Sequence, residues 1–287
     1  MRTHFDCLPC IMRQTVDAAR FATEDSNLQE KIIRKIITEM VQYDFNESPP
    51  YMSQIIHKHV RELSNMADPY REVKHQFTRL GLDLYDELKN IVQASQDPFS
   101  TAIKIAIAGN IIDFGVFSEI SEEQVHAAIE DCLQAPLPAE TVNHLKDDIA
   151  GAKNILFLGD NAGETVFDRL FIEEMPLEKV TYVVKGSPIV NDATMKDAEE
   201  AGLTELVRVI DNGSDAQGTI LKLCSAEFLD LLRQADLIIA KGQAHYETMS
   251  DLELNRIYYL FQAKCAVVAD DTGCQMGEMV FLKRIKN

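Results

Sequence analysis

Long apolar runs are absent from this sequence. No uninterrupted apolar stretch approaches the roughly 20 residues that a membrane-spanning helix needs. Residues 1–20 also lack the basic start and the apolar centre of a signal peptide. We therefore expect a cytoplasmic protein that has no membrane partner.

Cysteine is sparse, and its spacing excludes a disulfide framework. The chain has six cysteines, of which only Cys7 and Cys10 lie close together, so reduced thiols are expected. His4, Cys7 and Cys10 are each three residues apart, a spacing that would put three metal ligands on one side of a helix or turn. A tetrahedral zinc site would still need a fourth ligand. Buried, structural cysteines therefore remain the alternative to a second metal site.

Basic residues are too few for a nucleic-acid-binding protein. Lysine and arginine number 28 against 46 acidic residues, which gives a formal net charge of −18. Such an excess repels phosphate backbones and anionic lipids. A small phosphorylated ligand stays compatible with this charge, because local cations or a bound metal can reverse the field inside one cleft. The composition does not predict an oligomeric state.

Apolar residues are plentiful at 46%, and up to about residue 150 they recur at helical spacing. Leu28, Ile32, Ile36 and Met40 belong to one such stripe. Further helices are predicted over 51–63, 69–93, 100–111, 121–133 and 139–150, with "NESPP" and "QDPFS" as breaks. Residues 1–150 are thus predicted to form an all-helical N-terminal region.

Residues 151–287 alternate short β-rich runs with helix-length segments. The runs are "NILFLG", "VTYVVKG", "LVRVID", "DLIIAKG", "CAVVAD" and "MVFLKR". Alternation of this kind indicates a parallel sheet covered by helices. The predicted fold class is α/β, with the helical region preceding a three-layer α/β domain that has a mostly parallel, Rossmann-like sheet.

Polar residues follow the apolar runs, where an open parallel sheet forms its ligand crevice. A carboxylate and an amide follow the first run, lysines end the second and fourth, and further acids end the third and fifth. These residues are Asp160, Asn161, Lys185, Gly186, Asp211, Asn212, Gly213, Lys241, Gly242, Asp270 and Asp271. The loop after Lys185 adds Asp192. Helix caps and tight turns would explain "GDNAGE" taken alone, but chemistry repeated at several strand ends favours a site.

Oxygen donors from two of these loops suit a hard divalent cation. Asp160, Asn161 and Asp192 together would offer two carboxylates and an amide oxygen, the ligands that Mg²⁺ or Mn²⁺ prefers. Such an ion would polarise a phosphoryl oxygen and acidify a water, while Lys185 and Lys241 would neutralise the remaining phosphate oxygens. Exposed surface charge is the alternative for the lysines.

A helix predicted to begin near Gly163 would add backbone N–H donors for an anion. The sequence therefore predicts hydrolysis of phosphomonoesters. Asp211 and Asp270 are conceivable bases or nucleophiles, and the sequence ranks neither.

Four motifs resemble a known family. "GDNAGE", "VKGSPIVND", "IDNGSDAQGT" and "AKGQAHYE", preceded by "AIAGNIIDFG", look like the metal-dependent damage-control phosphatases, once a domain of unknown function. The chain is similar to the short prokaryotic branch, which commonly carries an N-terminal CxxC like "CLPC". The resemblance covers nearly the whole chain.

This resemblance implies a phosphatase that uses a divalent cation (Mg²⁺, Mn²⁺, Co²⁺ or Ni²⁺) and acts on small phosphorylated metabolites such as sugar phosphates or damaged cofactor precursors. It implies that Asp160, Asn161 and Asp192 hold the metal and that Lys185 and Lys241 bind phosphate. It also implies that Asn110 and Asp113 reach the site from the helical half. His245 departs from the family, whose members often have asparagine there.

Two other functions remain open from the sequence. An S-adenosylmethionine-dependent methyltransferase is the first, although its cofactor usually wants a glycine-rich turn where Asp160 and Asn161 stand. A non-catalytic sensor of a phosphorylated metabolite is the second, and the sequence does not exclude it.

Overall fold

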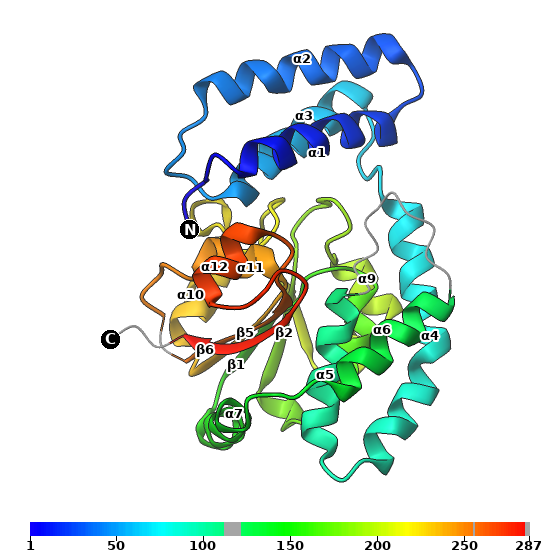
Figure 1. The fold of residues 1–287 in the computed structure, drawn as a ribbon, viewed down its shortest axis with the longest axis vertical. Helices are drawn as coiled ribbons and strands as arrows, with labels where there is room; N and C mark the ends of the chain where they lie inside the picture. Colours follow the sequence, from blue (N-terminus) through cyan, green and yellow to red (C-terminus); the bar gives the residue numbers. More distant parts are fainter. Residues whose placement is uncertain (112–121, 255, 285–287) are drawn as a thin grey trace.

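The computed structural model describes residues 1–111, 122–254 and 256–284. Three helices, α1 (Cys7–Ala22), α2 (Ser26–Gln42) and α3 (Pro49–Ser64), stand together at one end of the molecule (Figure 1). They share a hydrophobic core of their own, in which Ile32, Ile36, Met52 and Ile56 are buried. Of the stripe predicted on α2, Ile32 and Ile36 are fully buried, whereas Leu28 and Met40 are only partly buried. We call these three helices the cap.

Four more helices follow and contribute to the apolar cluster on one face of the sheet. They are α4 (Arg71–Ala94), α5 (Pro98–Ile111), α6 (Glu122–Gln134) and α7 (Ala139–Gly151). Helix α5 is apolar over most of its surface, as its "TAIKIAIAG" sequence requires of a helix enclosed by neighbours. Ala102, Ile103, Ile105 and Ala106 are all inaccessible to solvent. The described part of the chain contains no helix that could span a membrane.

Six strands form one sheet in the order β3-β2-β1-β4-β5-β6. The first five are parallel, and β6 pairs with β5 in the antiparallel direction. The strands are β1 (Ile155–Leu158), β2 (Val180–Val184), β3 (Arg208–Asp211), β4 (Leu237–Lys241), β5 (Ile257–Gln262) and β6 (Met279–Arg284). The predicted fold class, α/β with a mostly parallel sheet, is confirmed.

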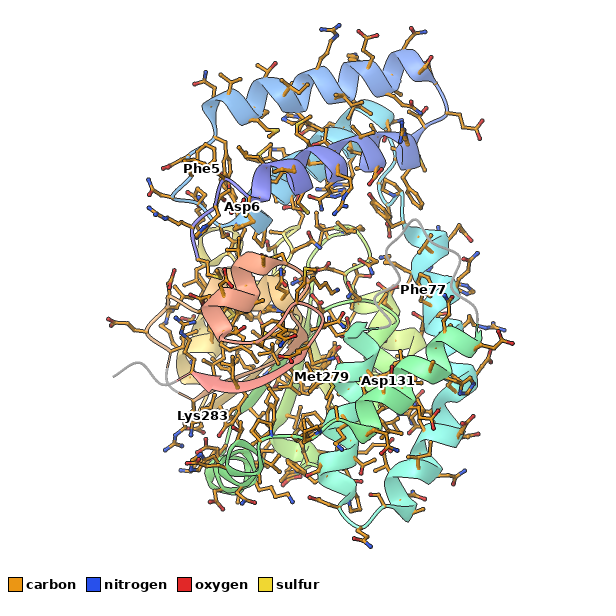
Figure 2. All side chains as sticks on the ribbon, in the orientation of Figure 1. Phe5, Asp6, Phe77, Asp131, Met279 and Lys283 are labelled. Atoms are coloured by element: carbon orange, nitrogen blue, oxygen red, sulfur yellow. The ribbon has the colours of Figure 1, made fainter. Side chains whose placement is uncertain are left out.

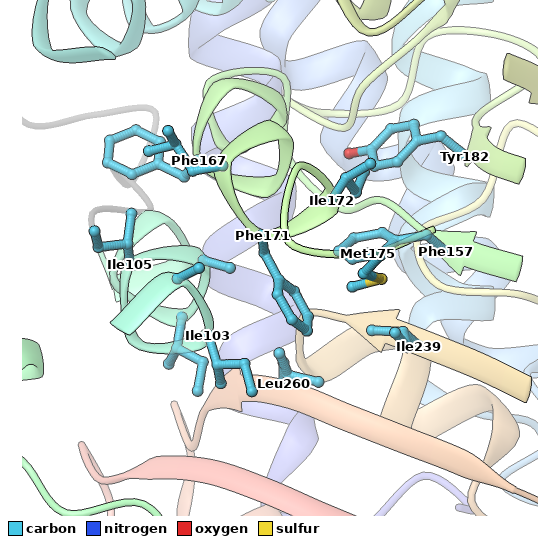
Figure 3. Close-up of a cluster of buried hydrophobic side chains, with 14 of the residues drawn as sticks. Ile103, Ile105, Phe157, Phe167, Phe171, Ile172, Met175, Tyr182, Ile239 and Leu260 are labelled. Atoms are coloured by element: carbon cyan, nitrogen blue, oxygen red, sulfur yellow. The ribbon is translucent and has the colours of Figure 1, made fainter. Parts of the chain in front are cut away.

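Helices cover both faces of this sheet. The connecting helices are α8 (Glu164–Ile172), α9 (Met195–Glu200), α10 (Ala226–Gln234), α11 (Gln243–Met249) and α12 (Ala266–Thr272). Alternate strand residues face opposite sides, so Phe157 enters one apolar cluster while Leu156 and Leu158 enter the other. Figure 3 shows Phe157 and Ile239 of the sheet beside Phe171 of α8 and Ile103 of α5.

One predicted strand is wrong. "CAVVAD" lies at the start of helix α12, and the fifth strand is Ile257–Gln262, a segment that is not among the predicted strands. Periodicity alone cannot separate a short apolar run in a strand from one in a helix. The β-favouring composition "IYYLFQ" was the better signal, and nearly all of that strand is buried between β4 and β6. Asp270 therefore stands exposed on α12 and not at a strand end.

The cysteine motif lies where the chain enters α1. Cys7 is half-buried and Cys10 is exposed, and the neighbouring Phe5 and Asp6 lie at the edge of the cap (Figure 2). Within the described residues, no group of three or more His, Cys, Asp or Glu side chains could hold a metal ion. The structure therefore does not assemble a second metal site from His4, Cys7 and Cys10.

Candidate active site

Strand β1 lies at the point where the strand order reverses. The chain proceeds from β1 outward to β2 and β3, then returns to place β4 on the other side of β1. Open α/β sheets bind ligands in the crevice outside the carboxyl ends of the strands at this reversal. Asp160 lies just beyond the end of β1, and Lys241 is the last residue of β4. Both predicted residues thus lie at the expected edge.

Backbone pairing brings the loop after β2 against the loop after β1. Asn161 and Asp192 form an isolated antiparallel bridge. The Ala162 N–H donates to the Asn191 carbonyl at 2.8 Å, and the Ala193 N–H donates to the Asp160 carbonyl at 2.8 Å. Asp192 therefore lies beside Asp160 and Asn161, although it is more than 30 positions from them in the chain. All three are buried.

A glycine makes room for the Asp160 carboxylate. Gly242 follows β4 with φ +81°, a conformation that side-chain-bearing residues rarely adopt. A Cβ at this position would lie 2.0 Å from Asp160 Oδ2. The end of β4 therefore holds this carboxylate in place by close backbone contact.

Glu164 is a central residue that the sequence reasoning did not assign. Its Oε1 accepts hydrogen bonds from Asn110 Nδ2 at 2.9 Å and from Asn161 Nδ2 at 2.6 Å. Its Oε2 accepts a hydrogen bond from Lys241 Nζ at 2.8 Å. The signal was present, since Glu164 is the last letter of "GDNAGE" and the first residue of α8.

Lys241 is fully buried and donates to two carboxylates. Besides Glu164, its Nζ contacts Asp168 Oδ1 at 2.6 Å, and Asp168 Oδ2 accepts the Tyr182 hydroxyl at 2.8 Å. Burial disfavours the charged amine, but the attraction of Asp168 and Glu164 outweighs it and raises the pKa of Lys241 above its usual value. For Asp168, burial raises the pKa to about 6, although the positive charge of Lys241 opposes that shift. Lys241, which the sequence predicts to bind phosphate, thus has its ammonium group between Glu164 and Asp168.

Lys185 lies against the second predicted loop. Its Nζ donates to the Gly218 carbonyl at 2.6 Å and lies 3.4 Å from Asp192 Oδ2. Both side chains are buried, Asp192 completely. The predicted lysine and the predicted metal ligand are therefore adjacent. We call Asp160, Glu164, Asp168, Lys185, Asp192 and Lys241 the site network.

Asn110 joins the helical half to this network. The Nδ2 group donates to Asp160 Oδ2 at 3.0 Å and to Glu164, while Oδ1 accepts the Gln262 N–H at 3.0 Å. Its amide is inaccessible to solvent. Asp113, predicted beside it, lies outside the described residues.

Gly163 lies at the entrance to α8 and lines a small cavity of about 20 Å³, which has room for about one water molecule. A Cβ here would lie 2.9 Å from Phe77 Cβ, so glycine lets α4 approach the start of α8. Asn161, Glu164 and Lys74 also line this cavity. The first turn of α8 lies next to the site network, and its Glu164 and Thr165 N–H groups donate to the Asn161 and Ala162 carbonyls.

Two other predicted residues have structural roles. His245 is buried, and its Nδ1 lies 2.6 Å from the Lys241 carbonyl, which can only accept, so Nδ1 carries the proton. Burial lowers the pKa of His245 well below its usual value, so the ring is neutral. Asp211 is exposed, and its carboxylate accepts the Gly213 N–H within a turn. Neither Asp211 nor Asp270 belongs to the site network.

Known proteins are similar to this chain over nearly its whole length. Residues 3–280 match the model of the damage-control phosphatase ARMT1-like domain. The chain belongs to this family. A damage-control phosphatase from Pyrococcus horikoshii is 32% identical over 99% of this chain and 98% of its own length. One from Archaeoglobus fulgidus is 34% identical over 96% of each chain.

A third relative and a solved structure extend the likeness. An uncharacterized protein from Methanocaldococcus jannaschii is 38% identical over 97% of this chain and 94% of its own length. The crystal structure of a DUF89 family protein from Pyrococcus horikoshii has a TM-score of 0.89, with 31% identity and 99% coverage of both chains. Membership of this family confirms the predicted enzyme class, a phosphatase.

Proposed function

We propose that this protein is a divalent-metal-dependent phosphatase that hydrolyses phosphomonoesters of small metabolites. The charge balance of the site network carries the metal requirement. Four carboxylates and two ammonium groups are buried there, which leaves two negative charges. Buried charge is costly unless it is paired or bound to a metal. One divalent cation would balance this excess.

The donor chemistry at the two paired loops fits such an ion. Asp160 and Asp192 offer carboxylate oxygens, and Asn161 uses its Nδ2 group to donate to Asp160 and Glu164. Its Oδ1 therefore faces away from those acids. We propose that Asp160, Asn161 and Asp192 hold the cation, and oxygen ligands favour Mg²⁺ or Mn²⁺ over softer ions. When bound, it would polarise a phosphoryl oxygen and lower the pKa of a water.

The rest of the site suits a phosphoryl group. Lys185 carries positive charge beside Asp192, and α8, whose N-terminus is the positive end of its dipole, begins at Glu164 of the site network. The substrates that we propose are sugar phosphates or damaged cofactor precursors, in keeping with relatives that are named damage-control phosphatases. The methyltransferase alternative is less well supported, because Asp160 and Asn161 occupy the turn where its cofactor would need a glycine-rich loop.

Hydrolysis of p-nitrophenyl phosphate tests the proposal. Mg²⁺, Mn²⁺, Co²⁺ and Ni²⁺ are added separately, and a chelator is the blank. We expect metal-dependent turnover that falls by about 100-fold or more in Asp160→Asn and in Asp192→Asn. Asp211→Asn is the matched control, since asparagine can keep the exposed turn. A non-catalytic sensor would bind phosphate without turnover, and activity indifferent to chelator and to both substitutions would overturn the proposal.

A further inference from the structure

Glu164 accepts the amide groups of two asparagines at once. Asn161 Nδ2 lies 2.6 Å from Glu164 Oε1 and 3.3 Å from Asp160 Oδ2, and Asn110 Nδ2 lies near the same two oxygens. A carboxylate can only accept hydrogen bonds, whereas an amide has one end that donates and one end that accepts. Facing two carboxylates, Asn161 must turn its NH₂ end toward them.

This arrangement decides which atom Asn161 offers to the space beyond. With its NH₂ end held by Glu164 and Asp160, the side chain points Oδ1 the other way. A reversed amide would point two N–H donors at a cation and would repel it. Asn161 is therefore a metal ligand in one orientation of its amide and an obstacle to metal binding in the other.

Glu164 is itself held on its far side. Lys241 Nζ, fixed by Asp168, donates to Glu164 Oε2, while Asn110 is anchored through Oδ1 by the Gln262 N–H of β5. The carboxylate is thus fixed from two directions by buried groups. Its position is set before any ligand arrives.

We propose that Glu164 is a positioning residue that keeps the Asn161 oxygen directed at the metal, and that Lys241 acts by holding Glu164. This role depends on the hydrogen-bonding chemistry of the side chain and not on its size, since only an acceptor-only group fixes the Asn161 amide. It rests on the proposed function in one respect, namely that Asn161 is a metal ligand. Glu164 itself is not assigned to the metal.

Mn²⁺ binding to the purified full chain, measured by titration calorimetry, tests this role without relying on turnover. Glu164→Gln keeps the size of the side chain but adds an NH₂ group that can drive the Asn161 amide to reverse. We expect its Kd for Mn²⁺ to rise about 10- to 100-fold, the usual effect of losing a group that orients a metal ligand. Glu173→Gln is the matched control, because Glu173 is a partly buried, ion-paired acid just beyond the other end of α8.

Two further variants separate chemistry from shape. Glu164→Asp is shorter but still acceptor-only, so we expect it to bind Mn²⁺ more tightly than Glu164→Gln. A residue that only filled space would give the opposite order, which would overturn the proposal. In an Asn161→Asp background both ends of residue 161 are oxygen, so adding Glu164→Gln should no longer weaken binding. An equal loss in both backgrounds would also overturn it.

The failures of the two proposals are distinguishable. If the unsubstituted protein binds no Mn²⁺ and its turnover ignores chelator, the proposed function fails. If the unsubstituted protein binds Mn²⁺ and Glu164→Gln binds it equally well, only the positioning role fails. Circular dichroism of each variant confirms that the fold is intact, and Glu164→Asp carries the comparison should Glu164→Gln not fold.

Discussion

The cap and the site network both lie at the carboxyl edge of the sheet, but different interactions hold them there. The site network is a set of charged groups buried among the strand ends. The cap has its own apolar core and contacts the loops of that edge through polar groups, among which Arg61 and Asp215 are partly exposed. Arg61 of α3 donates to the Pro188 carbonyl at 2.8 Å and pairs with Asp215, while Gln54 donates to Asp215 at 2.9 Å.

The difference teaches where a single polar contact matters. In the site network, removal of one partner leaves the other charged and enclosed, which is expensive. At the cap, water can replace a lost partner, so individual contacts contribute little. We therefore expect stability to be sensitive to charge at the sheet edge and tolerant of charge changes at the cap.

The largest effect is expected for Lys241→Met. It leaves Glu164 and Asp168 buried without their shared cation, which should cost about 3–5 kcal/mol of unfolding free energy. Urea unfolding in the presence of chelator measures it. Lys222→Met is the control, because Lys222 is 47% exposed in its pair with Glu47, and that pair is expected to contribute less than about 1 kcal/mol. Equal losses for the two variants would contradict the contrast.

An intermediate effect is expected from His57, a buried histidine in the cap. It packs against Tyr70, and burial, with a smaller contribution from Arg61, lowers the pKa of His57 to about 3. The unfolded chain takes up a proton near the ordinary histidine pKa while the folded protein does not. Stability is therefore lost as the pH falls from about 6.5 toward 3.

His57→Phe keeps a ring against Tyr70 and removes this titration. Between pH 6.5 and 5 we expect it to lose about 2 kcal/mol less unfolding free energy than the unsubstituted protein. Urea unfolding at several pH values measures the difference. Parallel pH profiles for the two proteins would show that His57 does not titrate as its burial requires.

The smallest effect is expected for Arg61→Ala. Loss of its partly exposed contacts with Pro188 and Asp215 should reduce the unfolding free energy by about 1 kcal/mol. Amide hydrogen exchange should quicken in α3 and not in α5. Arg34→Ala, which removes an exposed pair within α2, should change stability by no more than about 0.5 kcal/mol. A loss at Arg61 as large as that at Lys241 would remove the distinction between the two regions.

Much of the site could be predicted from sequence because it follows strand ends. The apolar runs of β1, β2 and β4 mark buried parallel strands, so Asp160, Lys185 and Lys241 were placed at one edge. The fifth strand was missed because a short apolar run fits a helix or a strand equally well until its neighbours are known. Its true position between β4 and β6 is a tertiary fact.

The sequence by itself determined the α/β class, the helical first half and the residue types at the sheet edge, because these follow from apolar periodicity and from what succeeds each run. Only the tertiary structure decided which acceptor oxygen of the site network pairs with which donor nitrogen. It turned Lys241 toward Glu164 and Asp168, and it paired the Asp192 loop with the Asn161 loop. The reason is physical: hydrogen-bond partners far apart in the chain are chosen by burial, where each enclosed donor and charge must find its complement.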